Sequence, residues 1–189
     1  MKQLTIVIPN KEGQTPEDTI CSLYQQTFTD FDIIIINDKE GNANVARNKG
    51  LAKVTSPYVL FSDNDINWYP YAIAEMVHQL DAYPSIAFAW GAYELSGKIW
   101  CNHEWDPALL RRKNYISTMT MVRTVLHPGF DPQIKRLQDW DVWLTMLEMG
   151  LTGKYVGRIL FETALRRGIT TNSISLEEAR KTITQKHKL

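Results

Sequence analysis

The chain has 189 residues, of which 44% are apolar and 22% are charged, a composition typical of one globular domain with a buried core. Lysine plus arginine equals aspartate plus glutamate, so the formal net charge is zero and neither nucleic acid nor an anionic membrane is indicated as a partner. The two cysteines are far apart, no apolar run has the length of a membrane span, and no signal peptide is recognisable. We therefore expect a single-domain cytoplasmic protein without a transmembrane segment, with peripheral membrane association through its mildly basic tail as a second expectation.

The first third of the chain alternates short apolar strands with amphipathic helices. Strands are predicted at 4–8, 31–36 and 58–62, and helices at 16–28 and 43–53. Thr15 is expected to cap the first helix. This order predicts a βαβαβ unit with a parallel sheet and right-handed crossovers.

Polar residues follow each of these strands. They are Pro9-Asn10, Asn37-Asp38 and Asp63-Asn64-Asp65. Because α/β proteins bind ligands where the carboxyl ends of parallel strands meet, these groups are expected to lie together. Asp63 and Asp65 would repel each other unless a proton, a base or a cation lies between them, and a divalent ion completed by a substrate's phosphates meets that need. The alternative is an ordinary polar turn after each strand.

Two further residues of this half are candidate nucleotide ligands. Asp38 is suited to accept hydrogen bonds from a base or a ribose hydroxyl, and Arg47 is suited to bind a base or a phosphate. The alternative for Arg47 is a solvated arginine on a helix face. No glycine-rich dinucleotide motif and no Gly-Lys-Ser/Thr loop follow the first strand, so dinucleotide binding and P-loop chemistry are unsupported.

The second half of the chain is less regular, and residues 91–105 show no clear periodicity. The predicted elements are helices at 71–83 and 137–150, strands at 86–90, 114–116, 120–122 and 154–160, and a terminal helix capped by Ser175.

Several residues of the second half are candidates for chemistry. Asp139 and Asp141 lie in the first turn of a predicted helix, where acids stabilise the helix dipole, but Asp139 is also placed to act as a general base. Arg166 and Arg167 are candidates to hold a diphosphate, with solvent-facing charge as the alternative. The aromatic candidates for stacking on a sugar, with burial in the core as the commoner alternative, are Trp68, Tyr69, Trp90 and Trp100.

Several motifs, in order, resemble the inverting glycosyltransferases of family 2, which have a GT-A fold. "TIVIPN" is similar to the family's first strand, and "IIIIND" to the strand that ends in the acid reading the nucleobase. "ANVARNKGLAKVTSPYVLFSDND" resembles the family's Ala-Arg-Asn helix followed by a strand and Asp-x-Asp. "NYISTMTMVR", "PGFDP" and "LQDWDVWLTMLEMG" resemble its acceptor-side half.

This resemblance implies an α/β fold: one Rossmann-like GT-A domain with a mostly parallel mixed sheet flanked by helices. Residues 1–66 would form the nucleotide-binding half, 67–175 the acceptor-binding half, and 176–189 a C-terminal helix and tail. The implied reaction moves a sugar from a nucleoside-diphosphate sugar, with a UDP-sugar favoured, to a hydroxyl of a glycan, lipid-linked or protein acceptor. Mn²⁺ or Mg²⁺ would be the cofactor.

The resemblance also implies residue roles. Asp38 would contact the nucleoside in a pocket shaped by Pro9 and Arg47. Asp63 and Asp65 would hold the ribose and the metal, with Asp65 favoured as the direct ligand, and Asp139 would remove the proton of the acceptor hydroxyl. The residues expected to line the acceptor or sugar pocket are Trp68, Trp90, Gln138 and Trp140.

Three positions depart from the family pattern. Asn37 replaces the usual first Asp of the nucleobase motif, Gln138 replaces the common Glu before the catalytic Asp, and Ile66 follows Asp65 where a further Asp is frequent. These departures keep two alternatives open. One is a nucleotidyltransferase that uses the same carboxylates and metal, and the other is an inactive module that binds a nucleotide or sugar without transferring it.

Overall fold

The computed structural model describes residues 2–39, 42–164 and 174–189. Its strands are β1 (Leu4–Lys11), β2 (Phe31–Asp38), β3 (Tyr58–Phe61), β4 (Ile66–Trp68), β5 (Phe88–Leu95), β6 (Lys98–Trp100), β7 (Met121–Arg123) and β8 (Gly153–Thr163). Its α-helices are α1 (Glu17–Tyr24), α2 (Ala43–Leu51), α3 (Ala72–Ala82), α4 (Pro107–Leu110), α5 (Gln138–Glu148) and α6 (Leu176–Lys186), and a 3₁₀ turn, η1, covers Thr124–Leu126.

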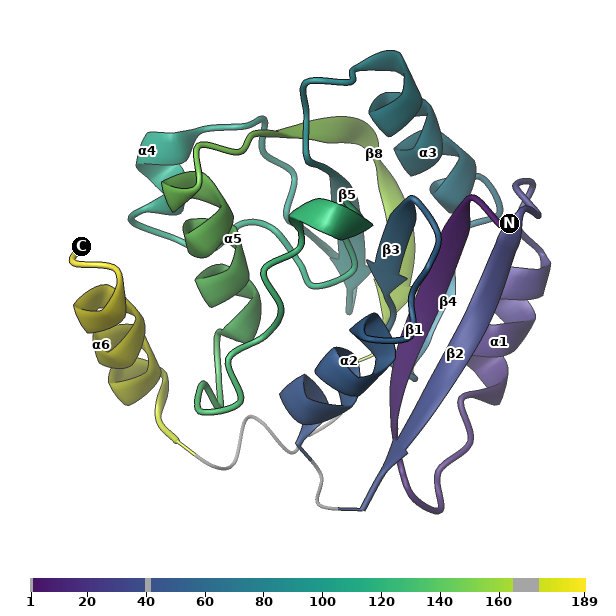
Figure 1. The fold of residues 1–189 in the computed structure, drawn as a ribbon, viewed down its shortest axis with the longest axis horizontal. Helices are drawn as coiled ribbons and strands as arrows, with labels where there is room; N and C mark the ends of the chain where they lie inside the picture. The colour runs from purple at the N-terminus through teal and green to yellow at the C-terminus, as the bar shows by residue number, and fades with distance from the viewer. Residues whose placement is uncertain (1, 40–41, 165–173) are drawn as a thin grey trace.

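Within these residues the strands form one mixed sheet in the order β2-β1-β3-β7-β5-β8-β4, with β6 paired to β5 (Figure 1). β1 runs parallel to both β2 and β3, as the predicted βαβαβ unit requires. β5 and β8 are also parallel, whereas β7 and β4 pair in antiparallel fashion with their neighbours. The predicted α/β fold with a mixed sheet flanked by helices is therefore confirmed.

The two faces of the sheet are buried in separate cores. Leu4, Ile6 and Ile8 of β1 pack in a core shared with α1 and α3. Val7, between them in the sequence, contributes to a second core with α5 and α6. The alternation follows from the pleat of a strand, which turns successive side chains to opposite faces. Helices therefore lie on both faces of the sheet (Figure 1).

The predicted elements of the second half are only partly correct. Residues 114–116 form a loop and not the predicted strand. Tyr115 and Ile116 are apolar because both are buried in the second core, and not because they belong to a strand. The short elements β4, β6 and α4 were not predicted. All three residues of β6 are exposed and show no alternation of apolar residues, so the pattern carries no strand signal. It joins β5 through a tight turn at Ser96 and Gly97, which both have positive φ.

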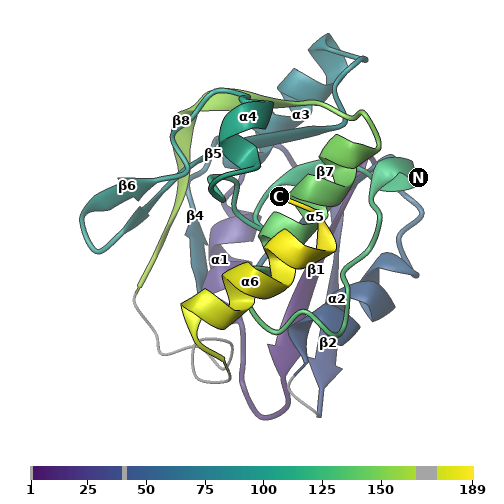
Figure 2. The ribbon, with the colours of Figure 1, turned by 90° about the vertical axis from the view of Figure 1, so that its left-hand side faces the viewer.

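Helix ends were predicted with mixed success. The capping box of Ser175 and Glu178 begins α6 as expected. In contrast, α1 begins after Pro16, and no side chain caps it, so the proposed cap at Thr15 is wrong. α6 lies alongside α5 on the outside of the molecule (Figure 2), and its Ile183 enters the second core. No helix among the described residues is both long and apolar enough to cross a membrane.

Candidate active site

A chain of side-chain amides joins the carboxyl ends of β1, β2 and β3. Asn10 Nδ2 donates to Asn37 Oδ1 at 2.9 Å, and Asn64 Nδ2 donates to Asn10 Oδ1 at 2.9 Å. Asn10 also donates to the carbonyl of Gln14 at 2.7 Å, which holds the loop after β1. The structure thus confirms that the three polar strand ends meet at one edge of the sheet. Asn37 only accepts in this amide chain, a contact that an aspartate could make as well.

Helix α2 supplies a buried cation to the end of β3. Arg47 Nη2 lies 2.6 Å from Asp63 Oδ1, and the Arg47 side chain is 3% exposed, against 38% for that of Asp63. The guanidinium also donates to Asn44 Oδ1 and lies over the ring of Phe130, 5.2 Å from its centroid. Arg47 is therefore neither a solvated arginine nor open to the cavity described below, but a support for Asp63.

The asparagines of α2 fix this helix to a distant loop. Asn48 exchanges two hydrogen bonds with the backbone of Phe130, at 2.7 and 2.8 Å. Asn44 Nδ2 donates to the carbonyls of Asp131 and Ile134. Because amides pair with backbone groups in both directions, these residues attach the segment at 130–134, which precedes α5, to the first half of the chain. The Ala-Arg-Asn stretch thus has a structural role in joining the two halves.

A cavity of about 850 Å³ brings together three predicted acids. Asp63 and Asp65 enter it from the end of β3, and Asp139 enters it from the first turn of α5. A second part of the wall comes from β6, from the loop around 113–119 and from α6. Residues distant in sequence therefore meet around one space large enough for a small-molecule ligand.

The carboxyl group of Asp139 is held by the start of its own helix. The backbone N–H of Trp140 donates to Asp139 Oδ1 at 2.9 Å, and the side chain of Asn114 donates a further hydrogen bond. Burial raises the pKa of Asp139 above its ordinary value, although these hydrogen bonds and the positive charge of Arg47 act in the opposite direction. A carboxylate with a raised pKa is a stronger base than an exposed one, as general-base chemistry requires.

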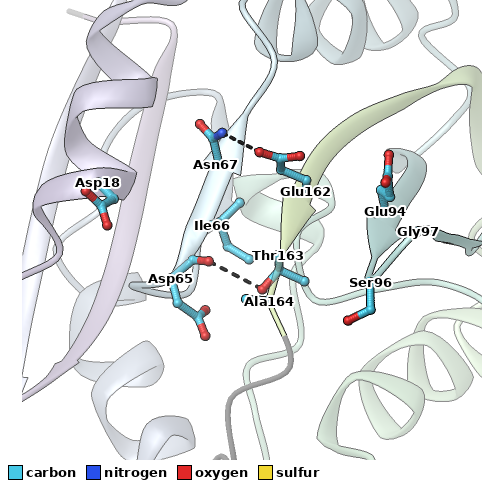
Figure 3. Close-up of a pocket in the computed structure, with 10 residues that line it drawn as sticks. All are labelled: Asp18, Asp65, Ile66, Asn67, Glu94, Ser96, Gly97, Glu162, Thr163 and Ala164. Carbon is cyan, nitrogen blue, oxygen red and sulfur yellow. Dashed lines mark hydrogen bonds between the residues drawn. The ribbon is translucent and has the colours of Figure 1, made fainter.

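Asp65 lies where this cavity adjoins a smaller one of about 400 Å³ (Figure 3). Its carbonyl accepts from Thr163 Oγ1 at 3.3 Å at the end of β8, and Asn67 on β4 bonds Glu162 at 2.7 Å. Carboxylate oxygens such as those of Asp65 are ligands that suit Mg²⁺ or Mn²⁺. In the described part of the chain no three His, Cys, Asp or Glu side chains are grouped to hold a metal. A bound ion would therefore take other ligands from phosphate and water, which is usual for Mg²⁺.

The remaining nucleotide candidates lie near the site but outside the lining of the large cavity. Asp38, at the end of β2, is buried, and its carboxylate accepts the backbone N–H of Asn42 at 2.8 Å and lies 3.6 Å from Lys49 Nζ. Pro9, at the end of β1, is half-buried beside Ile36 of β2. Asp38 thus also fixes the start of α2. Arg166 and Arg167 lie outside the described residues.

Two of the aromatic predictions are wrong. Trp68 and Trp90 are 2% and 0% exposed and lie in the core, so neither ring has a face open to a sugar. Trp68 is held by a hydrogen bond to Ser62. Gln138 and Trp140 do line the cavity, and Trp140 is anchored by its indole N–H, which donates to the Leu110 carbonyl at 2.7 Å.

One of the predicted stacking aromatics, Trp100, lines the cavity, and a second lining residue, Asn114, had no sequence signal. Trp100 is 48% exposed on β6 and lines the cavity, in contrast to the buried tryptophans. Its sequence neighbourhood showed no periodicity, so exposure could not be inferred. Asn114 bonds Asp139 from a loop 25 positions earlier in the chain, and no local pattern predicts such a pairing.

Comparison with known proteins gives a family match. The model of the family described as glycosyl transferase family 2 matches residues 39–133, which is half of the chain. The matched stretch includes α2, Asp63 and Asp65. None of the curated proteins compared with the chain matches it.

Solved structures with the same fold include two nucleotide-sugar complexes. S. aureus TarS 1-349 in complex with UDP-GlcNAc superimposes with a TM-score of 0.76 at 14% identity, covering 98% of this chain and 66% of that one. The mannosyltransferase PcManGT from Pyrobaculum calidifontis in complex with GDP-Man and Mn²⁺ gives 0.67 at 13% identity, covering 98% and 63%. A longer TarS structure matches over 39% of its length. The chain thus spans less than two thirds of each of these proteins, and the likeness at such identity establishes the fold.

Proposed function

The chain belongs to glycosyl transferase family 2, and from that premise we propose that it is a metal-dependent inverting glycosyltransferase. The donor would be a nucleoside-diphosphate sugar, with a UDP-sugar favoured, and the acceptor a hydroxyl of a glycan, lipid-linked or protein substrate. The observation that carries the proposal is the meeting of Asp63, Asp65 and Asp139 around one cavity.

Each acid has a role in this proposal. Asp139 takes the proton of the acceptor hydroxyl as the oxygen attacks the anomeric carbon, and its burial-raised pKa supports that role. The bond from the anomeric carbon to the nucleoside diphosphate breaks on the opposite side, so the configuration inverts. Asp63, oriented by Arg47, would hold the donor's ribose. Asp38 would contact the nucleoside, and Pro9 would line its pocket.

The metal site is proposed at the end of β3. Asp65 would be the main protein ligand, as the resemblance of its Asp-x-Asp motif to the family pattern implies. A Mn²⁺ or Mg²⁺ ion bound there would neutralise the charge that develops on the departing diphosphate. Asp65 would orient the diphosphate through that ion, while the core side chains beneath β3 keep the strand end fixed.

Calorimetric titration of UDP and of GDP, with and without Mn²⁺, tests the site directly. Binding of UDP only with the metal, and its loss in Asp65→Ala, is the expected result. Binding of GDP alone would keep the site but overturn the preference for a UDP-sugar. If neither nucleotide binds in any condition, the proposed function is wrong.

Activity assays on the same protein distinguish the proposal from its two alternatives, a nucleotidyltransferase and an inactive binding module. A nucleotidyltransferase would release pyrophosphate from a nucleoside triphosphate, which a glycosyltransferase does not do. An inactive binding module would bind the nucleotide but neither transfer nor hydrolyse the sugar of UDP-GlcNAc or GDP-Man.

A further inference from the structure

The charged residues that line the large cavity are of two kinds. Asp63, Asp65 and Asp139 supply the acids, and Lys98, Lys113 and Arg180 supply the cations. The cations come from three separate elements: β6, the loop after α4, and α6. Within the described ranges none of the three forms an ion pair, whereas Arg47, Lys49 and Lys186 are each paired with an acid. The whole chain has no net charge, so a general excess of positive charge does not explain the three cations at the cavity.

The cations belong to the acceptor side of the cavity. Lys113 precedes Asn114, which bonds the proposed base Asp139, and both Lys113 and Asp139 act electrostatically on the Cys101 thiol. Lys98 and Arg180 lie on β6 and α6, two elements that follow residue 66 in the sequence and line the same cavity as the strand ends. In the proposed function the metal ion at Asp65 would neutralise the donor diphosphate, so we assign the three cations to the acceptor.

The same wall offers an apolar platform. Trp100 is 48% exposed, and it lies two residues from Lys98 on β6, so both side chains emerge from one face of the strand. An exposed indole face suits the apolar face of a sugar ring, and a neighbouring cation suits a charged substituent on that ring. Leu176 of α6, which is 47% exposed, extends this surface.

We propose that this wall is an acceptor subsite for a sugar that carries a negatively charged substituent, a phosphate or a carboxylate. The sugar ring would stack on Trp100, and Lys98, Lys113 and Arg180 would bind the anion. This inference rests on the proposed function, because it assigns the acceptor side of the same cavity. The proposed function alone allows any acceptor with a hydroxyl group. The subsite restricts the acceptor to an anionic glycan.

The test is a titration followed through the indole N–H signals of ¹⁵N-labelled protein, with UDP and the diamagnetic ion Mg²⁺ present to fill the donor side. The probes are glucose 6-phosphate, glucuronate and neutral glucose, and Trp100→Phe identifies the signal of Trp100. The expected result is that the anionic sugars shift that signal and glucose does not. The two anionic probes distinguish a phosphate from a carboxylate as the group recognised.

Variants attribute the effect to the cations. Lys113→Gln and Arg180→Gln are each expected to weaken binding of the anionic probe roughly tenfold, the loss of one charge-assisted hydrogen bond. Arg112→Gln is the matched control, since Arg112 has the same charge and adjoins Lys113 but lies outside the cavity lining. Equal shifts with glucose, or equal weakening by Arg112→Gln, would overturn the proposal.

The outcome separates this inference from the proposed function. If UDP binds with Mn²⁺ but no anionic sugar shifts the Trp100 signal, the subsite is wrong and the glycosyltransferase proposal stands. If an anionic sugar binds in the absence of any nucleotide binding, the subsite stands and the proposed function fails.

Discussion

Arg47 and Asp63 form a charged hydrogen bond of 2.6 Å that connects α2 to the end of β3. Only the aspartate of this pair is substantially exposed, so the arginine carries its charge inside the protein. Among the described residues Arg47 Nε has no hydrogen-bond partner, which leaves the Asp63 carboxylate as the main compensation for burying the cation. A residue of the candidate site is thus also part of the packing.

Asp63→Asn should therefore destabilise the fold as well as impair nucleotide binding. Only the arginine of this ion pair is buried, and removing the carboxylate leaves its charge uncompensated, so we expect the free energy of unfolding to fall by about 1–3 kcal/mol. Urea denaturation measures this change. Lys2→Met is the control, because it breaks the exposed pair of Lys2 with Asp30 and should cost about 1 kcal/mol or less. Equal effects of the two substitutions would contradict the buried role of Arg47.

Gly50→Ala should destabilise the protein although Gly50 lies inside α2. Helix propensity alone predicts a gain of about 1 kcal/mol for alanine. A β-carbon at this position would overlap Val7 of β1, however, so we expect a net loss of about 1–3 kcal/mol in urea denaturation. The double variant Gly50→Ala with Val7→Ala removes the overlap. If it is no better than the sum of the single variants, the steric explanation is wrong.

The sequence predicted the first half of the fold because its signals are local. Apolar runs and polar strand ends in 4–63 each arise within a few residues, and the parallel order follows from the crossovers. The loop at 114–116 was misread because its apolar residues are buried by tertiary contacts and not by a strand. β6 was missed because an exposed two-stranded hairpin has no buried face to reveal its period.

The candidate site was also predicted only in part, and for the same reason. The three acids could be proposed because they follow a strand or begin a helix, positions with a known geometric meaning. Burial of Trp68 and Trp90, against exposure of Trp100, depends on how distant elements pack and has no local signature. The pairing of Arg47 with Asp63 and of Asn114 with Asp139 likewise joins separate segments.

α6 is fastened to α5 by His187, and this contact should depend on pH. His187 Nε2 lies 2.8 Å from Asp141 Oδ1 and Nδ1 lies 2.8 Å from Glu148 Oε1, with Lys186 also bound to Asp141. Burial alone would lower the pKa of His187, but hydrogen bonds and charges of the two acids outweigh it and raise that pKa. The stabilisation is therefore fully present below the ordinary histidine pKa of about 6.5 and is lost as the pH rises through the raised value.

His187→Gln should accordingly cost about 1.5–3 kcal/mol at pH 6, the range for hydrogen bonds to charged groups, and less at pH 9. Urea denaturation of both proteins at the two pH values measures the difference. In an Asp141→Asn background the effect of His187→Gln should shrink, because one of its two partners is gone. A cost that does not vary with pH would show that the charge of His187 plays no part.

Asp139→Asn should abolish most sugar transfer while leaving UDP binding in place. Loss of a general base typically lowers the rate by about 10²–10⁴-fold. The base acts only when ionised, and burial raises the pKa of Asp139, so the acid limb of the kcat/KM profile should lie above pH 3.8, the ordinary aspartate value. Transfer assays with UDP-GlcNAc and GDP-Man across pH measure both effects. Unchanged turnover in the variant would remove Asp139 from the mechanism.

The same substitution should raise stability at neutral pH. A carboxyl group whose pKa is raised on folding favours the folded state while it is protonated, and this contribution is lost as the pH rises through the folded-state pKa of Asp139. Asparagine is never ionised, so it avoids that cost and can still accept from Trp140 and Asn114. We expect a higher Tm for Asp139→Asn than for wild type at pH 7, with the difference vanishing below pH 3.8, the ordinary pKa of the group. A lower Tm at pH 7 would mean that the ionised carboxylate is stabilised in the folded protein, against the raised pKa that supports its role as a base.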